Sequence, residues 1–245
     1  LPAFTFAAVP SAVVNAGCVP VLCEVDNTLR IDIEDFAARL DGCDAVIISH
    51  MRGHTSDMDA ILQLCDTAGI PVIEDAAHSL GTTWNGQPIG TLGRAGCFSF
   101  QSYKLVNAGE GGILVTDDAE LVARAIILSG AYEHNWRKHL GPADHALEAA
   151  LSRWQNRLPL YNLRLSNLSA AIIRAQLPEI PRRVRDGLRN HDRVAARLSA
   201  APAITVPAPL RGERRAPDSL QFTLEGLSAN EIDSFVAAAA AQGVS

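Results

Sequence analysis

The sequence predicts an α/β fold in which a mostly parallel sheet is covered by helices on both faces. Short apolar runs alternate along the chain with segments of helical periodicity, which is the pattern of parallel strands joined by helices. The length of 245 residues suffices for one large α/β domain and part of a second. A hydrophobic share of 48% with 20% charged residues is ordinary for a globular protein.

The first part of the chain contains five predicted strands, at residues 19–25, 44–49, 70–74, 96–101 and 112–116. Helical periodicity predicts helices between them, at residues 33–40, 56–68 and 119–128. Ser56 and Asp57 are candidate N-caps of the second helix, and Gly69 with Pro71 predicts its end. The Asn85-Gly86 pair predicts a two-residue type I′ hairpin turn.

The character of the chain changes after residue 176. We expect two consecutive helices, at residues 168–177 and 182–200, and then strands at 203–206 and 219–224 with a polar loop at 211–217 between them. We therefore place a domain boundary near residue 180, with a large domain at 1–180 and a smaller domain at 181–245. The chain begins without methionine and stops just after a helix, so we expect the first part of the large domain to be missing and the small domain to be incomplete.

Composition argues against several classes of partner. The net charge of −6, with no basic block interleaved with aromatic residues, argues against nucleic acid. No apolar stretch approaches the length of a membrane span. The five cysteines include no C-x-x-C pair and mostly lie in apolar runs, so we expect buried thiols in a reducing compartment, the cytoplasm.

His50 and His54, followed by Asp57 and Asp59, have a spacing that binds metal from one face of a helix. Gly53 and the flanking turn residues disfavour a helix there, so we expect no metal site and histidines that are exposed or contact substrate.

Lys104 is one of two lysines in a chain with nineteen arginines. An arginine cannot be deprotonated in a protein, whereas a lysine amine can lose its proton and act as a nucleophile. Lys104 also follows the apolar run 96–103, where a solvated charge is unexpected. The residue itself leaves two interpretations open: a Schiff-base lysine, or a lysine whose tip reaches water from a strand end.

The neighbours of Lys104 favour the first interpretation. Asp75 ends a predicted strand, where it can hold a cationic ring nitrogen in the ligand crevice or cap the next turn. Ser99 and Ser102 can donate to a phosphate, and Gly109-Glu-Gly-Gly112 permits close backbone approach. No nucleotide-binding glycine motif is present. A lysine, a carboxylate, phosphate donors and a flat apolar partner are what pyridoxal phosphate requires.

Six segments in order resemble the DegT/DnrJ/EryC1/StrS family of pyridoxal-phosphate-dependent sugar aminotransferases. They are Pro2-Ala-Phe-Thr-Phe6, Val72-Ile-Glu-Asp-Ala-Ala-His78, Gly96-Cys-Phe-Ser-Phe100, Lys104, Gly109-Glu-Gly-Gly112 and Tyr161-Asn-Leu-Arg-Leu-Ser-Asn-Leu-Ser-Ala-Ala171. The resemblance implies an aspartate aminotransferase-like fold, in which a seven-stranded sheet forms the large pyridoxal-phosphate-binding domain beside a smaller α+β domain. It also implies a homodimer that transfers an amino group from glutamate or glutamine to a keto-sugar, commonly nucleotide-linked.

The resemblance implies roles for individual residues. Lys104 would bind the cofactor covalently and move the proton in both half-reactions, and Asp75 would pair with the ring nitrogen. Phe6 would stack on the ring, His78 would lie near the phenolic oxygen or the ring face, and Ser99 would bind the phosphate. Further phosphate donors would precede Leu1.

Asn162, with Arg164, would reach the phosphate or the substrate of the neighbouring subunit. The segment 49–57 departs from the family pattern at Arg52 and His54, so we expect it to affect substrate choice. The stretch 131–159, rich in Trp, Arg and His, is a second candidate for a substrate loop.

Three alternatives remain open at the level of function. Family members with histidine in place of the lysine act as dehydratases, against which Lys104 argues. Amination of a non-sugar ketone and a regulatory cofactor-binding protein without turnover are the others. Arg214 and Arg215 can neutralise a nucleotide diphosphate, but we interpret them as part of a solvated loop.

Overall fold

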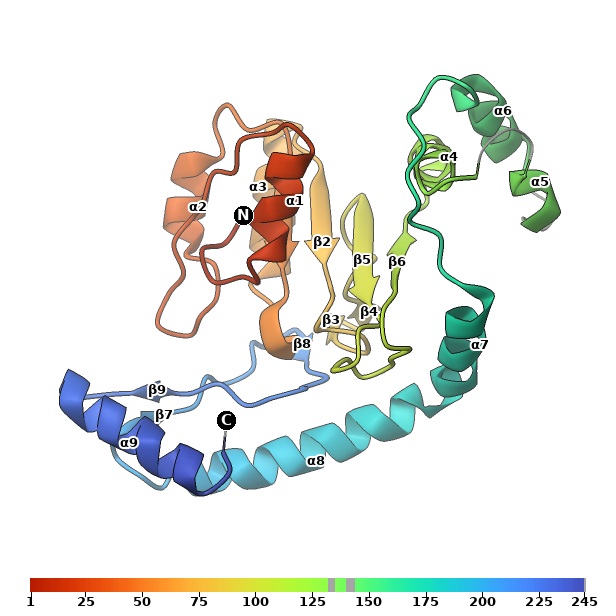
Figure 1. The fold of residues 1–245 in the computed structure, drawn as a ribbon. Coiled ribbons are helices and arrows are strands. Elements are labelled where there is room, and N and C mark those ends of the chain that lie inside the picture. The colour runs from red at the N-terminus through yellow and green to blue at the C-terminus, as the bar shows by residue number, and fades with distance from the viewer. Residues whose placement is uncertain (132–134, 140–143, 245) are drawn as a thin grey trace.

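The structure is a computed structural model that describes residues 1–131, 135–139 and 144–244. Its main sheet has the strand order β1-β2-β5-β6 (Figure 1). Strands β1 (Val46–Ser49), β2 (Val72–Asp75) and β5 (Ala95–Ser99) run parallel, and β6 (Gly112–Val115) runs antiparallel to β5. The predicted α/β fold is confirmed. Within the described residues the sheet has four strands, fewer than the seven that the resemblance implies.

The helices of the first part form where the sequence predicts them, at α2 (Ile33–Arg39), α3 (Met58–Ala68) and α4 (Ala119–Leu128). Asp57 caps α3, because its Oδ1 accepts a hydrogen bond from the Ala60 amide at 3.1 Å. Gly69 ends the same helix with φ +68°, a conformation that glycine adopts without strain. Ser56 is not a cap, because its hydroxyl accepts from the Ile31 amide instead.

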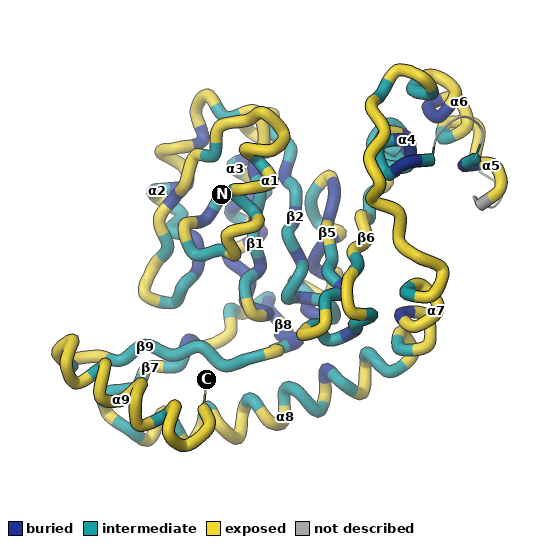
Figure 2. The backbone as a smooth tube through the Cα atoms, viewed as in Figure 1, coloured by how far each residue is buried: buried dark blue, intermediate teal, exposed yellow. Residues whose placement is uncertain are grey.

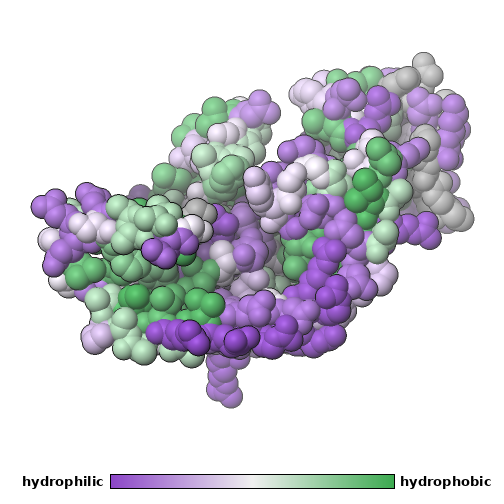
Figure 3. Space-filling model, turned by 60° about the horizontal axis from the view of Figure 1, so that its bottom comes forward, coloured by the Kyte–Doolittle hydropathy of each residue, from purple (hydrophilic) through white to green (hydrophobic). Residues whose placement is uncertain are grey.

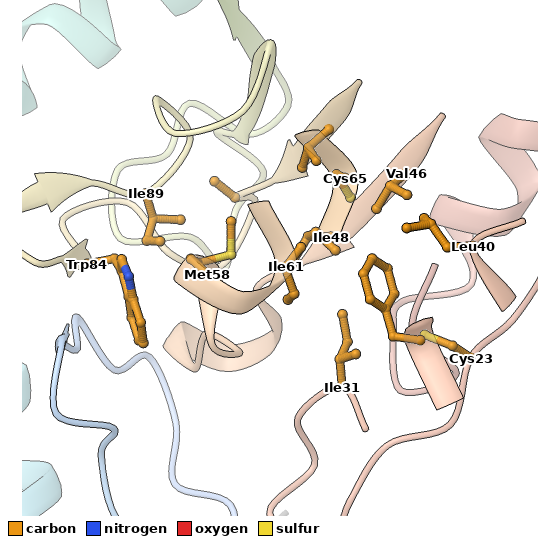
Figure 4. Close-up of a cluster of buried hydrophobic side chains, with 13 residues drawn as sticks. Cys23, Ile31, Leu40, Val46, Ile48, Met58, Ile61, Cys65, Trp84 and Ile89 are labelled. Atoms are coloured by element: carbon orange, nitrogen blue, oxygen red, sulfur yellow. The ribbon is translucent and has the colours of Figure 1, made fainter. Parts of the chain in front are cut away.

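One face of the sheet carries the main hydrophobic core. Ile48 of β1 packs in one cluster with Met58 and Ile61 of α3 (Figure 4). On the other face, Ile47 and Ile73 line a groove of about 630 Å³ together with residues of α1 (Ala8–Asn15), a helix that the sequence did not predict. Because successive strand residues point to opposite faces, Ser49 and Asp75 lie on the same face as Ile47 and Ile73.

The predicted strand at 19–25 is wrong. This stretch makes only isolated bridges, Pro2 to Cys23 and Val25 to Ile31. Pro20 has no amide hydrogen for a ladder, and Val19 is 85% exposed, so the apolar run is not enough to form a strand here.

The predicted hairpin is confirmed. Strands β3 (Thr83–Trp84) and β4 (Gln87–Pro88) are joined by Asn85 at φ +48° and Gly86 at φ +84°, as a type I′ turn requires.

The second part of the chain begins with two helices close to their predicted places, α7 (Asn167–Gln176) and α8 (Ile180–Leu198), which a short 3-10 turn joins. Hydrophilic side chains gather along the α8 side of the molecule (Figure 3). Strands β7 (Ile204–Thr205) and β9 (Thr223–Leu224) pair in a separate small sheet, followed by α9 (Ala229–Ala241). Both strands are shorter than predicted.

The predicted polar loop at 211–217 is a structural element instead. It contains β8 (Glu213–Arg214), which pairs with β3. Glu213 accepts hydrogen bonds from Arg30 Nη2 at 2.9 Å and from the Thr55 amide at 3.0 Å. Arg215 is only 4% exposed, so its interpretation as a solvated side chain is wrong, whereas Arg214 is exposed. The carboxylate of Glu213 supplies the countercharge that allows Arg30 and Arg215 to be buried.

Much of the described part of the stretch 131–159 is helical, and residues 155–159 are not. It forms α5 (Trp136–His139) and α6 (His145–Trp154), and Leu151 packs with Ile127 of α4. The rest of the predicted substrate loop, at 132–134 and 140–143, lies outside the described residues. An exposed segment then leads to α7 (Figure 2).

All five cysteines are free, but their burial is only partly as predicted: Cys23 and Cys65 are buried, Cys43 is intermediate, and Cys18 and Cys97 are exposed. No helix in the described ranges combines the length and the apolar character needed to cross a membrane.

Candidate active site

Asp75 occupies the carboxyl end of β2, in register with Ser49 of β1 and Cys97 of β5. The Ser49 hydroxyl donates to Asp75 Oδ2 at 2.7 Å, and the Ala77 amide donates to Oδ1 at 3.1 Å. The carboxylate therefore caps the following turn, as one interpretation of the sequence expected. Each of its oxygens keeps a further lone pair, so capping leaves Asp75 able to hold a ring nitrogen as well.

Lys104 lies in the turn after β5, with its Nζ 2.7 Å from His78 Nε2. Burial lowers the pKa of Lys104 below its usual value, and the charge of Arg52 acts in the same direction. The negative charges of Asp218 and Asp75 oppose this shift without reversing it. The amine of Lys104 is therefore more easily deprotonated than in water.

His78 also contacts Asp218, a residue that the sequence did not single out. Its Nδ1 lies 2.6 Å from Asp218 Oδ2. Asp218 lies 140 residues further along the chain, in the segment after β8. No local pattern marks this residue, because only the folded chain brings it to His78.

Ser99 ends β5 two residues beyond Cys97, so it lies on the same face of the sheet as Asp75. Its Oγ accepts from the Gln101 amide at 3.3 Å, which leaves the hydroxyl hydrogen able to donate to a phosphate. The Ser102 hydroxyl instead donates to the Gly109 carbonyl at 3.1 Å.

The glycine run before β6 permits a close approach of another segment. Gly111 has φ +151°, and a Cβ there would lie 2.8 Å from Leu165 Cδ1.

Two residues of the predicted site are apart from this group. Phe6 precedes α1 and is 62% exposed. Asn162 lies in the exposed segment before α7 and accepts from Arg164 Nη2 at 3.4 Å. Within the described chain no hydrogen bond joins either Phe6 or Asn162 to Lys104, Asp75 or His78.

The two histidines of the segment 49–57 are not exposed, so that part of the prediction is wrong. His50 is 1% exposed, and its two ring nitrogens contact Glu74 and Thr55. His54 is 8% exposed, and burial lowers its pKa to about 4. Arg52 is the exposed member of this segment. It adopts the left-handed conformation, with φ +58°, which is uncommon for a residue with a side chain.

Comparison with known sequences identifies a family. The profile of the DegT/DnrJ/EryC1/StrS aminotransferase family matches residues 1–245. The L-glutamine:scyllo-inosose aminotransferase of Streptomyces griseus is 34% identical over 230 residues, which is 90% of this chain and 53% of that protein. The 3-amino-5-hydroxybenzoate synthase of Amycolatopsis mediterranei is 32% identical over 93% of this chain and 56% of its own length. The chain thus spans about half the length of these curated relatives.

Comparison with solved structures gives the same result. The aminotransferase TlmJ from Streptoalloteichus hindustanus superposes with a TM-score of 0.83 at 26% identity, covering 99% of this chain and 62% of that one. The 3-amino-5-hydroxybenzoic acid synthase structure superposes with a TM-score of 0.82 at 28% identity, covering 96% of this chain and 59% of that one. The aminotransferase fold of these proteins is the fold of this chain.

Proposed function

The chain belongs to the DegT/DnrJ/EryC1/StrS aminotransferase family, and on that basis we propose that the protein transfers an amino group from glutamate or glutamine to a keto-sugar, using pyridoxal phosphate. The observation that supports this most directly is that Asp75 ends β2 and Lys104 follows β5, the strand that pairs with β2 in parallel. Ligands of open α/β sheets bind at such strand ends.

The residues of the site fit the cofactor chemically. Lys104 offers an amine whose pKa is lowered by burial, as covalent attachment to an aldehyde requires. Asp75 offers a carboxylate held by the Ser49 hydroxyl and the Ala77 amide, suited to a protonated ring nitrogen. Ser99 offers a hydroxyl hydrogen for the phosphate.

When bound, pyridoxal phosphate supplies an electron sink that stabilises negative charge at the carbon losing its proton. Lys104 would hold the cofactor, and its amine, when free, would take the proton from the α-carbon of the amino donor. The same amine returns a proton in the second half-reaction. Asp75, held by the Ser49 hydroxyl and the Ala77 amide, would pair with the ring nitrogen. We propose a ping-pong order, in which the donor leaves as its oxo acid before the keto-sugar binds.

The remaining family residues act at the edges of this site in our proposal. Phe6, whose ring is exposed, would stack on the cofactor, and His78 would lie near its phenolic oxygen or ring face. Asn162 and Arg164 reach the site of a partner subunit in a cytoplasmic homodimer. The division into a large domain at 1–180 and a small domain at 181–245 stays a prediction.

The substrate class is proposed from relatives and from Arg52. Relatives include a GDP-perosamine synthase of Vibrio cholerae, 32% identical over 74% of this chain, and a UDP-N-acetyl-3-dehydro-alpha-D-glucosamine 3-aminotransferase of Acidithiobacillus ferrooxidans, 35% identical over 74%. Arg52 is exposed beside Lys104, and no ion pair engages it among the described residues. We assign Arg52 to an anionic group of the substrate, a donor carboxylate or a nucleotide phosphate.

The proposal is tested by the first half-reaction of the loaded protein. Addition of glutamate or glutamine should remove the visible absorption of the bound cofactor and release one equivalent of the matching oxo acid. A keto-sugar added afterwards should restore the absorption. Lys104→Ala should abolish turnover, whereas Lys138→Ala, the matched change at the other lysine, should leave it intact.

Other outcomes identify the alternatives. If only a non-sugar ketone restores the visible absorption, the amino acceptor is that ketone and not a keto-sugar. Loss of water from a keto-sugar without amino transfer would identify a dehydratase. An absorption that no amino donor alters would contradict amino transfer and indicate a regulatory protein.

A further inference from the structure

A chain of hydrogen bonds joins three side chains from distant parts of the sequence. Lys104 Nζ lies 2.7 Å from His78 Nε2, and His78 Nδ1 lies 2.6 Å from Asp218 Oδ2. The side chains of His78 and Asp218 are 13% and 15% exposed, so water has little access to the contact between them. Both ring nitrogens of His78 are therefore engaged, one by the amine and one by the carboxylate.

The chemistry of Asp218 fixes where the protons lie. Burial would raise the pKa of Asp218, but the hydrogen bond and charge of His78, the Ser219 hydroxyl and Arg52 together lower it. An ionised carboxylate can only accept hydrogen bonds, so the hydrogen of the 2.6 Å contact belongs to His78 Nδ1. In the neutral ring, Nε2 is then the unprotonated nitrogen, and it faces Lys104 as an acceptor.

Packing holds Asp218 at this place. The Ala216 amide donates to the buried Thr82 hydroxyl at 3.0 Å. Gly53 has φ +82°, and a Cβ there would lie 2.9 Å from the Ala216 carbonyl oxygen, so the loop at 53 approaches this segment closely. The Ser219 hydroxyl donates to the other carboxylate oxygen of Asp218 at 3.1 Å. Neighbours on both sides thus orient the carboxylate before any ligand binds.

The electrostatic effect of Asp218 on Lys104 does not explain a catalytic role for this carboxylate. Its negative charge, like that of Asp75, favours the protonated form of Lys104, whereas Arg52 favours the neutral form. A carboxylate that acted only through its field would therefore hinder the nucleophile. The hydrogen-bond chain gives it a different effect, because it supplies the proton of Lys104 with an acceptor.

We propose that Asp218 is a positioning residue that holds His78 with its hydrogen on Nδ1, so that Nε2 orients the Lys104 amine and accepts its proton. The proton leaves Lys104 Nζ and bonds to His78 Nε2, and the resulting imidazolium stays paired with the Asp218 carboxylate. No other reactant is needed. The inference rests on the proposed function only in taking Lys104 as the reactive amine.

The tautomer of His78 tests the proposal directly. We would label the histidines of the full chain, free of cofactor, with ¹⁵N and record their ring nitrogen shifts at a pH where His78 is neutral. His78→Gln identifies the signals. The wild-type protein should carry the hydrogen on Nδ1, and Asp218→Asn should move at least about half of the population to the Nε2 form, because the neutral amide no longer demands a donor.

The matched control is Asp192→Asn, since Asp192 lies beside His191 at 3.3 Å and its loss changes the net charge equally. This variant should leave the signals of His78 unchanged. The proposal would be overturned if wild-type His78 carries its hydrogen on Nε2, or if the tautomer population of His78 is the same in the wild type and in Asp218→Asn. The wild-type result needs no variant, so a folding defect in Asp218→Asn does not prevent the test.

Kinetics of the loaded protein provide the second measurement. Asp218→Asn should lower kcat about 10- to 100-fold while the KM of the amino donor changes little, because in this proposal Asp218 acts on Lys104 through His78 and not on the donor. An unchanged kcat would also overturn the proposal. If the tautomer result holds but the wild-type protein transaminates nothing, the proposed function fails while the role of Asp218 in the Lys104 site stands.

Discussion

Single residues show where local sequence is informative about this site. Lys104 and Asp75 are singled out by their places at or after predicted strands, where a parallel sheet gathers its functional groups, and His78 by the family resemblance alone. The structure brings the Lys104 amine to His78, and the roles of all three residues stay predictions. Asp218 is not anticipated by the sequence, whereas Arg52 is, as a departure from the family pattern. Asp218 meets His78 only in the folded chain, and the sequence does not reveal the left-handed backbone of Arg52.

Because Lys104 is partly buried, the free energy of unfolding of the cofactor-free protein should depend on pH. Its pKa in the folded state lies below the unfolded value of 10.5, so the folded protein bears the cost of a buried charge at neutral pH. That cost is relieved as pH rises through the folded pKa towards the unfolded one. Lys104→Met should therefore raise Tm relative to wild type most at neutral pH, with the difference shrinking towards about pH 11.

The measurement is a series of thermal melts of both proteins over that range, with Lys138→Met as the matched change at an exposed lysine. A difference in Tm between Lys104→Met and the wild type that stays constant or grows with pH would contradict the burial of the amine.

At the scale of elements, helices and the hairpin could be predicted more closely than strands. The caps of α3 and the Asn85-Gly86 turn are local signals, and both are confirmed. A strand forms only where it has a partner strand. Residues 19–25 make only isolated bridges, whereas β8 pairs with β3, more than a hundred residues earlier in the chain. The segment 211–217 is polar in composition, yet Glu213 and Arg215 are buried in ion pairs, one of them with the distant Arg30.

The buried ion pairs of Glu213 with Arg30 and Arg215 should contribute to the free energy of unfolding. Glu213→Gln leaves Arg30 and Arg215 buried without their countercharge, so the free energy of unfolding should fall by about 3–5 kcal/mol. Arg214→Ala, at the exposed neighbouring position, should change it by no more than about 0.5 kcal/mol. Denaturant unfolding measures both variants. A loss below about 1 kcal/mol in Glu213→Gln would show that the cluster adds little to stability.

At the scale of the whole molecule, the site draws on both parts of the chain. The end of β2 and the turn after β5 supply Asp75, His78 and Lys104, and the segment after β8 supplies Asp218. The exposed segment before α7 presents apolar side chains to solvent, among them Tyr161 at 56% and Leu163 at 72% exposure. In our proposal a partner subunit covers these side chains, which places Asn162 near the partner's site.

The presence of only two lysines allows a direct test of the central claim, that Lys104 binds pyridoxal phosphate in a site shared with Asp75. The protein is loaded with the cofactor, reduced with borohydride, digested, and its peptides are weighed by mass spectrometry. The account predicts one reduced cofactor on the peptide of Lys104 and none on that of Lys138, with labelling weakened in Asp75→Ala. Labelling of Lys138, or no labelled lysine at all, would contradict it.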